Sequence, residues 1–202
     1  ALHRIMRDAP ARLIIATFAS LISRVQQVVN VAQRHNRKIA IAGRSMVENA
    51  KMARELGYLD IPDGTLVTLD EIKKLPAHET VIMATGAQGE PMAVLGRLAF
   101  GRHASLSIQE EDTVVLSSHT IPGNEEVIHG VINRLFQAGA DVYYDPVAPV
   151  HVSGHASQEE QKLLINLIRP KYLVPIHGEL RHLHAHARLA RELGLPEENI
   201  LV

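Results

Sequence analysis

The run Leu13-Ile-Ile-Ala-Thr-Phe18 decides the fold class, because it is apolar and β-branched with no alternation of polar residues. A run of this kind is typical of a strand that is covered on both faces of a sheet. Ala19 and Ser20 follow, and apolar residues then recur at helical spacing from 21 to 32. A covered strand that leads directly into an amphipathic helix predicts one unit of a parallel α/β sheet.

The same pattern recurs along most of the chain. Further strands are predicted at 38–42, 64–68, 80–84, 112–116 and 141–144, with helices at 46–56, 69–75, 92–99 and 125–138. Strands that alternate with helices at this pitch predict an α/β fold with a doubly wound, mainly parallel sheet of the Rossmann or flavodoxin-like type. The connector Asp145-Pro-Val-Ala-Pro149 predicts a boundary between a large unit at 1–148 and a small βα segment at 149–202.

The composition is that of an ordinary soluble globular protein, with 46% apolar and 21% charged residues in a chain of 202. The formal net charge of −1 gives no sign of a nucleic-acid or membrane surface, so a polyanion would have to meet a local patch. The absence of cysteine excludes disulfides and thiolate metal sites, and it fits a reducing cytoplasm. No apolar run approaches the roughly 20 residues of a membrane span. The start at Ala1 suggests a segment of a longer protein.

Two histidine–glycine turns lie in the last third of the chain, His151-Val-Ser-Gly-His155 and Pro175-Ile-His177-Gly-Glu179. A helix predicted at 159–168 and a short buried strand predicted at 172–176 separate them, which brings both turns to the same sheet edge. Imidazoles at such an edge can bind metal, move protons or hold phosphate. The alternative is chance, because a chain with 12 histidines will place some of them in loops.

A closing helix is predicted at 181–193, and a last short strand at 199–202. His182, His184 and His186 fall in this helix at positions i, i+2 and i+4, so at most two of them share one helix face. The pattern contains no carboxylate that would support zinc binding by a pair of these histidines. We therefore expect these histidines to face solvent.

Polar loops follow the predicted strands, and Ser, Thr and Gly before a helix offer hydroxyls and free N–H groups to an anion. Two such loops are Gly86-Ala-Gln-Gly89 and Ser117-Ser118. The structural alternative is that Ser and Thr at these positions are ordinary helix caps. The glycine pair matches neither a dinucleotide fingerprint nor a Walker phosphate loop. Arg44, Arg97 and Arg102 are either local phosphate partners or solvated surface residues.

Taken alone, the residues indicate an anion-binding α/β domain with a two-histidine edge. No His-x-His-x-Asp-His cluster occurs in the sequence, whereas a hydrolytic zinc site needs three or more protein ligands. One alternative to an enzyme is a stand-alone, non-catalytic module that grips a nucleotide or an RNA 5′ phosphate. Another is a small-molecule transferase or hydrolase on a flavodoxin-like sheet. This alternative has less support, because the sequence contains no Gly-x-Ser-x-Gly nucleophile motif.

Four motifs occur in order along the chain: Thr85-Gly-Ala-Gln-Gly-Glu-Pro-Met92, Ser117-Ser-His-Thr-Ile-Pro-Gly-Asn-Glu125, His151-Val-Ser-Gly-His155 and Lys171-Tyr-Leu-Val-Pro-Ile-His-Gly-Glu179. With this order and spacing, the chain resembles the ribonuclease J family of metallo-β-lactamase-fold nucleases, which carry an inserted β-CASP domain. The resemblance covers essentially the whole chain from Arg12 onward. Ala87 departs from it, because the family usually has serine there, and this loop therefore lacks one hydroxyl.

The resemblance implies that residues 1–148 form the β-CASP domain and that residues 149–202 form the C-terminal part of the metallo-β-lactamase domain. It implies a catalytic role for His155 near the scissile phosphate, and zinc binding by His177. The residues implied to bind the substrate phosphate are His151, Ser153, Gly154 and His155. The possible RNA-contact residues of the preceding loops are Gly86, Gln88, Gly89, Ser117 and Ser118.

The implied activity is hydrolysis of RNA phosphodiesters, by 5′-to-3′ exonuclease steps that favour a 5′-monophosphate and by endonuclease cleavage. The cofactor implied for the intact parent is a pair of zinc ions. The family's His-x-His-x-Asp-His motif belongs to a segment N-terminal to this chain. We therefore expect a fragment that supplies an RNA-channel wall, a phosphate-binding loop and part of a zinc site, and that is inactive alone. The resemblance also implies a cytoplasmic parent that forms a homodimer and does not associate with membranes.

Overall fold

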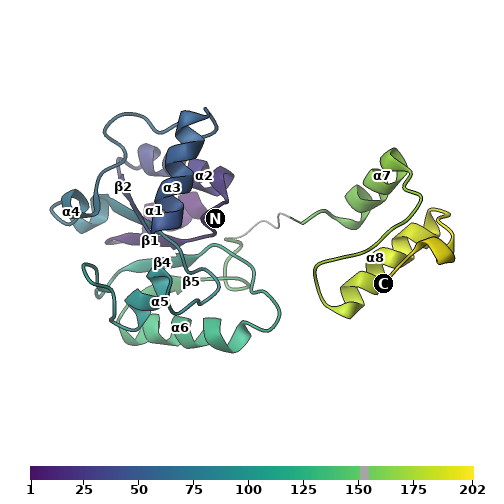
Figure 1. The fold of residues 1–202 in the computed structure, drawn as a ribbon. Helices are drawn as coiled ribbons and strands as arrows, with labels where there is room; N and C mark the ends of the chain where they lie inside the picture. Colours follow the sequence, from purple (N-terminus) through teal and green to yellow (C-terminus); the bar gives the residue numbers. More distant parts are fainter. Residues whose placement is uncertain (151–154) are drawn as a thin grey trace. The chain divides into compact units, whose positions relative to one another are not determined.

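The structure of the chain is a computed structural model that describes residues 1–150 and 155–202. Its contacts divide the chain into two compact units, Ala1–Val152 and Ser153–Val202, which we call unit 1 and unit 2. Figure 1 shows that unit 1 is built around a sheet and that unit 2 is built from helices.

Unit 1 is organised around five parallel strands. These are β1 (Leu13–Ala16), β2 (Lys38–Ala42), β3 (Thr80–Ala84), β4 (Thr113–Leu116) and β5 (Asp141–Tyr143), in the spatial order β2-β3-β1-β4-β5. Strand β1 lies at the centre and is buried at every position, as expected for a strand with neighbours on both sides and helices on both faces. The predicted α/β class and parallel sheet are confirmed.

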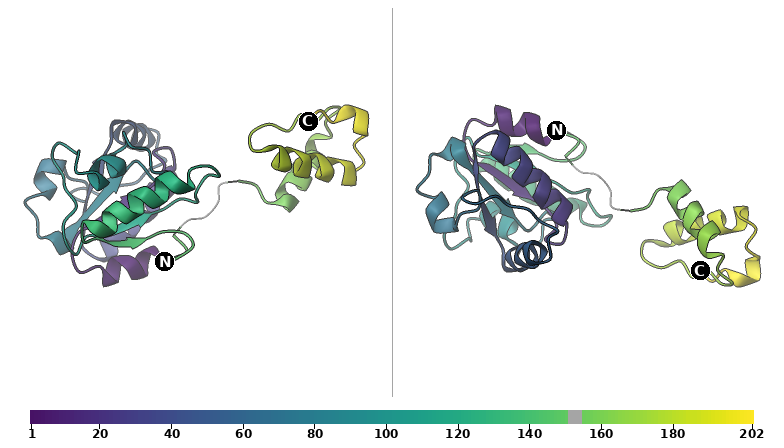
Figure 2. Two further views of the ribbon diagram at one scale, coloured as in Figure 1. Left: turned by 90° about the horizontal axis from the view of Figure 1, so that it is seen from below. Right: turned by 90° about the horizontal axis from the view of Figure 1, so that it is seen from above.

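One face of the sheet is covered by α1 (Leu2–Asp8), α2 (Ile22–Arg34) and α3 (Arg44–Glu55), as Figures 1 and 2 show. Apolar residues of these helices pack in one core cluster with Leu13 and Ile15 of β1. These two strand residues share a face because side chains of a strand alternate with a period of two.

The opposite face is covered by α4 (Leu69–Ile72), α5 (Val94–Ala99) and α6 (Glu125–Gln137), and a 3-10 helix, η1 (Ala77–Glu79), precedes β3. The apolar residues of α4, α5 and α6 form a second core cluster with Ile14 of β1. The sheet is therefore a middle layer between two helical layers, which explains why its strands read as continuous apolar runs.

The prediction of a strand at 64–68 is wrong. In the structure this segment makes only an isolated parallel bridge, between Ile39 and Leu66. A turn that begins at Pro62 precedes the bridge, and Thr68 already caps α4 through a capping box. Too few residues remain between the turn and the cap to form a strand along β2.

Helix α1 is present in the structure although no helix was predicted there. Its buried residues Leu2, Ile5 and Met6, together with Ala9 just after the helix, lie at positions i, i+3, i+4 and i+7. This is the spacing of an amphipathic helix, so the signal was present in the sequence. Helix α1 has only seven residues, and short helices depend on tertiary packing for their stability.

Unit 2 contains α7 (Gln158–Ile168), α8 (Leu180–Glu192) and the 3-10 helix η2 (Glu197–Asn199). The helices predicted at 159–168 and 181–193 are confirmed. None of the helices in the described part of the chain is long and apolar enough to cross a bilayer.

The predictions of strands at 172–176 and 199–202 are wrong. In the described part of unit 2 these segments form only an isolated bridge, between Leu173 and Ile200. The prediction that the first of these segments is buried is wrong as well, because Ile176 is 80% exposed. A strand needs a neighbour along its length to satisfy its backbone groups. Unit 2 provides such a neighbour at one point only.

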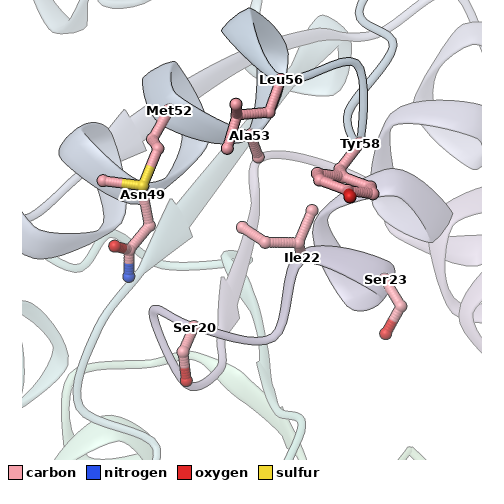
Figure 3. Close-up of a pocket in the computed structure, with 8 residues that line it drawn as sticks. All are labelled: Ser20, Ile22, Ser23, Asn49, Met52, Ala53, Leu56 and Tyr58. Carbon is pink, nitrogen blue, oxygen red and sulfur yellow. The ribbon is translucent and has the colours of Figure 1, made fainter.

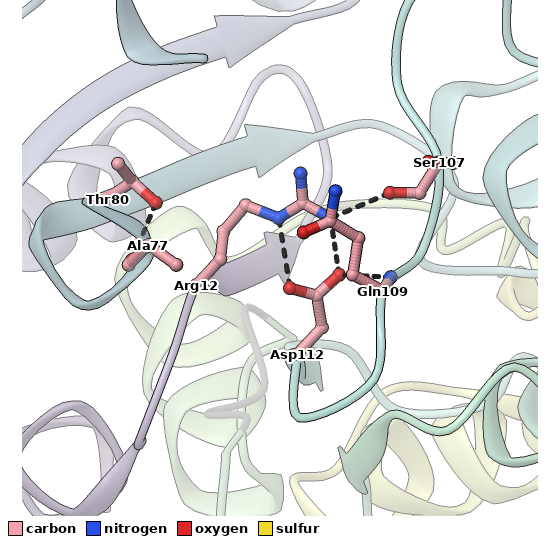
Figure 4. Close-up of polar contacts among 6 residues, drawn as sticks. All are labelled: Arg12, Ala77, Thr80, Ser107, Gln109 and Asp112. Atoms are coloured by element: carbon pink, nitrogen blue, oxygen red, sulfur yellow. Dashed lines mark hydrogen bonds and ion pairs between the residues drawn. The ribbon is translucent and has the colours of Figure 1, made fainter. Parts of the chain in front are cut away.

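A buried ion pair ties β1 to β4 at the amino edge of the sheet (Figure 4). Arg12 Nε donates to Asp112 Oδ1 at 3.0 Å, and Arg12 Nη2 donates both to Asp112 Oδ2 and to the Ser107 carbonyl oxygen, the latter at 2.7 Å. The backbone N–H of Gln109 donates to Asp112 Oδ2 at 2.8 Å. The Asp112 side chain is only 1% exposed, so these donors replace water around its charge.

Candidate functional site

The carboxyl ends of β1 and β4 form the topological switch point of unit 1. From β1 the chain crosses to β2 on one side of the sheet, and from β4 it passes to β5 on the other side. In open α/β sheets, ligands usually bind in the crevice at such a point. Thr17 follows β1 and Ser117 follows β4, and the Ser117 N–H donates to the Ala16 carbonyl oxygen at 2.8 Å.

The residue directly before the first histidine–glycine turn is anchored at this crevice. The Ser117 hydroxyl donates to the Val150 carbonyl oxygen at 2.7 Å, and both residues are buried. The chain therefore leaves the described part of unit 1 at the carboxyl edge of the sheet. The predicted phosphate-binding residues His151, Ser153 and Gly154 lie outside the described residues.

Buried and partly buried hydrogen bonds join the side chains and backbone of the neighbouring loops. The Gln88 amide donates through Nε2 to the His119 carbonyl oxygen at 2.6 Å, and Gln88 Oε1 accepts from the Ile121 N–H at 3.0 Å. The Ser118 hydroxyl donates to the Ala87 carbonyl oxygen at 2.8 Å. We call the buried side chains of Gln88, Ser117 and Ser118 the loop clamp, because together they connect the loops that follow β3, β4 and β5.

The two loop glycines are needed for close packing. Gly86 has φ +108°, and a Cβ there would lie 3.0 Å from Leu95 Cβ. Gly89 has φ +77°, and a Cβ there would lie 3.0 Å from the backbone nitrogen of Ile128. Side chains at these positions would therefore be strained and would crowd α5 and α6.

The sequence-predicted RNA contacts Gly86, Gln88, Gly89, Ser117 and Ser118 thus lie together at the carboxyl edge, and all are buried. Their polar side-chain groups bond to the protein itself, so their main role in the structure is to hold the loops. Direct contact with RNA stays a prediction. One polar group in this region differs, because the buried Thr17 hydroxyl has no hydrogen-bond partner in the described part of the chain.

Replacing Gln88 with leucine is expected to lower the free energy of unfolding of the chain by about 1–3 kcal/mol, because the change removes two hydrogen bonds that the buried Gln88 side chain makes to the loop after β4. Urea denaturation monitored by circular dichroism measures the effect. Gln33→Leu is the matched control, since Gln33 is exposed on α2. Equal unfolding midpoints for the Gln88 and Gln33 variants would show that the loop clamp does not stabilise unit 1.

A histidine–aspartate pair adds a group that the sequence patterns did not single out. His119 Nδ1 lies 2.5 Å from Asp145 Oδ2, and the two side chains are 59% and 30% exposed. His119 follows β4 and Asp145 follows β5, so the pair links the same loops as Ser117 does. The residues are 26 positions apart, and their proximity follows from the parallel pairing of β4 with β5.

Unit 2 brings the side chains of His155 and His177 together. The rings of His155 and His177 stack with centroids 6.0 Å apart and planes inclined by 12°. The two imidazoles are therefore neighbours within unit 2.

The positions of both histidines are set by the helices that follow them. Ser157 caps α7 in a capping box with Glu160, two residues after His155. His177 has φ +68°, in the left-handed region, which costs an L-residue roughly 1–3 kcal/mol. Gly178 follows with φ +118°, and α8 begins at Leu180. Backbone strain of this kind recurs at functional sites, which is consistent with a functional role for His177.

The described residues contribute at most part of a metal site. Neutral imidazole nitrogen is a preferred ligand for zinc, and His155 and His177 fit that chemistry. No group of three or more His, Asp or Glu side chains that could hold a metal ion is found in the described part of the chain. Because a zinc site needs at least three protein ligands, further ligands would have to come from elsewhere.

The other candidates from the sequence are on the surface. His182 and His184 are exposed on α8, as predicted, whereas His186 is partly buried. The His182 Nδ1 atom accepts a hydrogen bond from the Glu179 N–H at 3.1 Å, so its ring helps to begin α8. Arg44 is exposed at the start of α3.

Unit 1 also has an apolar groove of about 470 Å³ between α2 and α3 (Figure 3). Figure 3 shows the side chains of Ile22, Met52 and Tyr58 around this groove. Its full lining is Ser20, Ile22, Ser23, Asn49, Met52, Ala53, Leu56 and Tyr58. None of the predicted site residues lines it, so it is separate from the candidate site.

Comparison with known proteins gives two family matches. Residues 10–135 match the family described as "Ribonuclease J, beta-CASP domain", and residues 139–202 match "Zn-dependent metallo-hydrolase RNA specificity domain". The matched ranges meet near residue 137, whereas the contacts divide the chain between residues 152 and 153. The expected boundary between 148 and 149 stays a prediction.

Curated relatives match the chain over its full length. Proteins called ribonuclease J from Thermus thermophilus, Synechocystis and Mycolicibacterium smegmatis are 50%, 45% and 45% identical to it over 201 residues. The match covers 100% of this chain in each case, but only 35%, 31% and 36% of the relatives. The chain therefore spans about a third of the length of these relatives.

Proposed function

Because the chain belongs to the ribonuclease J family, we propose that it works as part of a zinc-dependent ribonuclease that hydrolyses RNA phosphodiesters. The proposed activity combines 5′-to-3′ exonuclease steps, which favour a 5′-monophosphate, with endonuclease cleavage. Residues 1–148 supply the β-CASP domain and one wall of the RNA channel. Residues 149–202 supply the C-terminal part of the metallo-β-lactamase domain, including the phosphate-binding loop and part of the zinc site.

The observation that carries this proposal is the stacking of His155 on His177, with ring centroids 6.0 Å apart. We assign zinc binding to His177, whose strained backbone holds the imidazole at the start of α8. We assign contact with the scissile phosphate to His155, where an imidazole can hold a phosphate oxygen or move a proton. Zinc, when bound, supplies a Lewis acid that activates water and offsets negative charge on the phosphate.

We assign binding of the substrate phosphate to four residues, His151, Ser153, Gly154 and His155. Imidazole, hydroxyl and glycine N–H groups are all suitable donors for phosphate oxygens. The anchoring of Val150 by Ser117 supports this assignment, because it starts the segment at the carboxyl edge, where ligands of α/β sheets bind.

Exposed apolar residues in unit 2 support its role as part of a larger domain. Leu163, Leu164, Leu167 and Ile168 of α7 are each more than half exposed, and they lie on neighbouring turns of one helix. A contiguous apolar patch of this kind marks an interface. We propose that the remainder of a metallo-β-lactamase domain covers it in the intact ribonuclease, whose proposed form is a cytoplasmic homodimer with two zinc ions in each site.

The intact ribonuclease is expected to degrade 5′-monophosphorylated RNA and to lose this activity when a chelator removes zinc. The isolated chain is expected to show no chelator-sensitive RNA decay, because its described residues contain too few metal ligands. Gel analysis of end-labelled RNA measures both activities. Chelator-sensitive decay by the pure chain would contradict the proposed incomplete site. Undiminished cleavage by the intact protein without zinc would contradict the proposed chemistry.

A further inference from the structure

An exposed aromatic ring at the end of α5 lies close to two guanidinium groups. The Cζ atom of Arg102 lies 5.6 Å from the centroid of the Phe100 ring, and the Cζ atom of Arg134 lies 5.7 Å from it. The ring remains 40% exposed, and both arginines are exposed. We call Phe100, Arg102 and Arg134 the aromatic–arginine patch.

The surroundings of the patch carry positive charge that the protein does not neutralise. Arg97, Arg102 and Arg134 have no carboxylate partner among the residues that the structure describes. The Nε atom of Arg97 is buried and, in the same described part, has no hydrogen-bond partner. The pKa of His103 lies below its ordinary value because of burial and, secondarily, because of the positive charges of Arg97 and Lys73.

The patch lies at the amino edge of the sheet, away from the loop clamp. Helices α5 and α6 run back from the carboxyl edge toward the start of the next strand, so their last turns lie at the opposite edge. Helix α6 has 13 residues and is therefore about 20 Å long. A ligand at the patch would be separate from the loops that follow β3, β4 and β5.

We propose that the aromatic–arginine patch binds single-stranded RNA at the amino edge of unit 1, apart from the loop clamp. This inference rests on the proposed ribonuclease function, which brings RNA to the protein. Guanidinium groups pair with phosphate oxygens, and an aromatic ring or a guanidinium plane stacks on an unpaired base. An acidic peptide would use the charges alone and would gain little from the exposed ring. The combination of the exposed ring with arginines that have no carboxylate partner in the described part of the chain therefore favours RNA.

The location predicts a dependence on RNA length that binding measurements can detect. With zinc removed to prevent cleavage, fluorescence anisotropy would compare the intact ribonuclease on an RNA of about 20 nucleotides and on a 5′-monophosphorylated tetranucleotide. In the double variant Arg102→Gln, Arg134→Gln, we expect about tenfold weaker binding of the long RNA and a smaller salt dependence. The tetranucleotide is expected to bind as it does to the unchanged protein.

Variants of the ring separate stacking from charge. Phe100→Leu retains an apolar side chain but loses the aromatic face, and we expect about fivefold weaker binding of the long RNA. Phe100→Trp retains the face and is expected to bind normally. The matched charge control is Arg54→Gln, because Arg54 is exposed on α3 at the other face of the sheet. This control is expected to leave the affinity unchanged.

Two failures can be told apart. If the unchanged protein binds both RNAs and the patch variants bind the long RNA equally well, the inference about the patch is overturned while the proposed function stands. If the unchanged protein binds neither RNA, the proposed function itself fails. Competition by polyglutamate as strong as that by RNA, with no effect of Phe100→Leu, would identify an acidic protein partner and would also overturn the RNA assignment.

Discussion

Replacing His177 with alanine is expected to lower RNA hydrolysis by the intact ribonuclease at least about a hundredfold, and to lower its zinc content in parallel. Loss of a residue that merely orients a metal ligand typically costs 10- to 100-fold in metal affinity or activity, and loss of a ligand should cost at least as much. Zinc content by mass spectrometry and initial rates on 5′-monophosphorylated RNA measure the two effects on the same preparation.

Two further variants make this prediction specific. His184→Ala is the matched control, because His184 is an exposed histidine on α8, the same helix that His177 precedes. It is expected to retain both zinc and activity. His155→Ala is expected to lose activity while retaining zinc, because we assign His155 to the scissile phosphate and not to the metal. A His177→Ala protein with full zinc occupancy would contradict the ligand assignment, whatever its activity.

Replacing Asp112 with asparagine is expected to destabilise the chain by about 3–5 kcal/mol, the effect typical of breaking one side of a buried ion pair. The change leaves the Arg12 guanidinium, whose side chain is only 12% exposed, without a negative partner at the amino edge of the sheet. It also weakens the bond that Asp112 accepts from the Gln109 N–H. Urea denaturation of the 202-residue chain, fitted for the unfolding of unit 1, measures the loss.

The exposed pair of Arg7 and Asp8 provides the control for this experiment. Its side chains are 62% and 52% exposed, so water already surrounds both charges. Asp8→Asn is expected to leave the unfolding midpoint unchanged. A double-mutant cycle with Arg12→Ala would give the coupling between Arg12 and Asp112 directly. Loss of stability in Asp112→Asn no larger than in Asp8→Asn would show that the buried pair is not a main support of the sheet.

The sheet could be predicted from the sequence because its strands carry an unusually direct signal. Buried parallel strands such as β1 and β3 are apolar on both faces, and each leads into a helix with its own apolar period. Strand order could not be predicted in the same way. It depends on pairings such as β1 with β3 and β1 with β4, which join residues far apart in the chain.

Segments that lack a neighbouring strand along their length were predicted less well. The apolar residues at 172–176 have the composition of a buried strand, but in unit 2 only Leu173 has a strand-like partner, and Ile176 is exposed. The composition of a segment indicates that it can form a strand, but it does not show whether a neighbouring strand is available. The segment at 64–68 failed for a related reason, because the cap at Thr68 ends it early.

The sequence indicated which residues belong to the candidate site better than it indicated how they are arranged. The two histidine–glycine turns indicated His155 and His177, and the structure brings their rings together in unit 2. The sequence did not indicate that Gln88 and Ser117 would use their polar groups to hold the loops. A hydroxyl before a helix has the same sequence signature whether it binds an anion or a backbone carbonyl. Only tertiary contacts distinguish the two.

In the proposed ribonuclease, His177 of this chain is a ligand of the zinc site. Anomalous diffraction at the zinc edge from crystals of the intact protein tests this role. A zinc peak is expected about 2.0–2.1 Å from a ring nitrogen of His177. A fully occupied zinc site whose ligands exclude His177 would overturn the assignment.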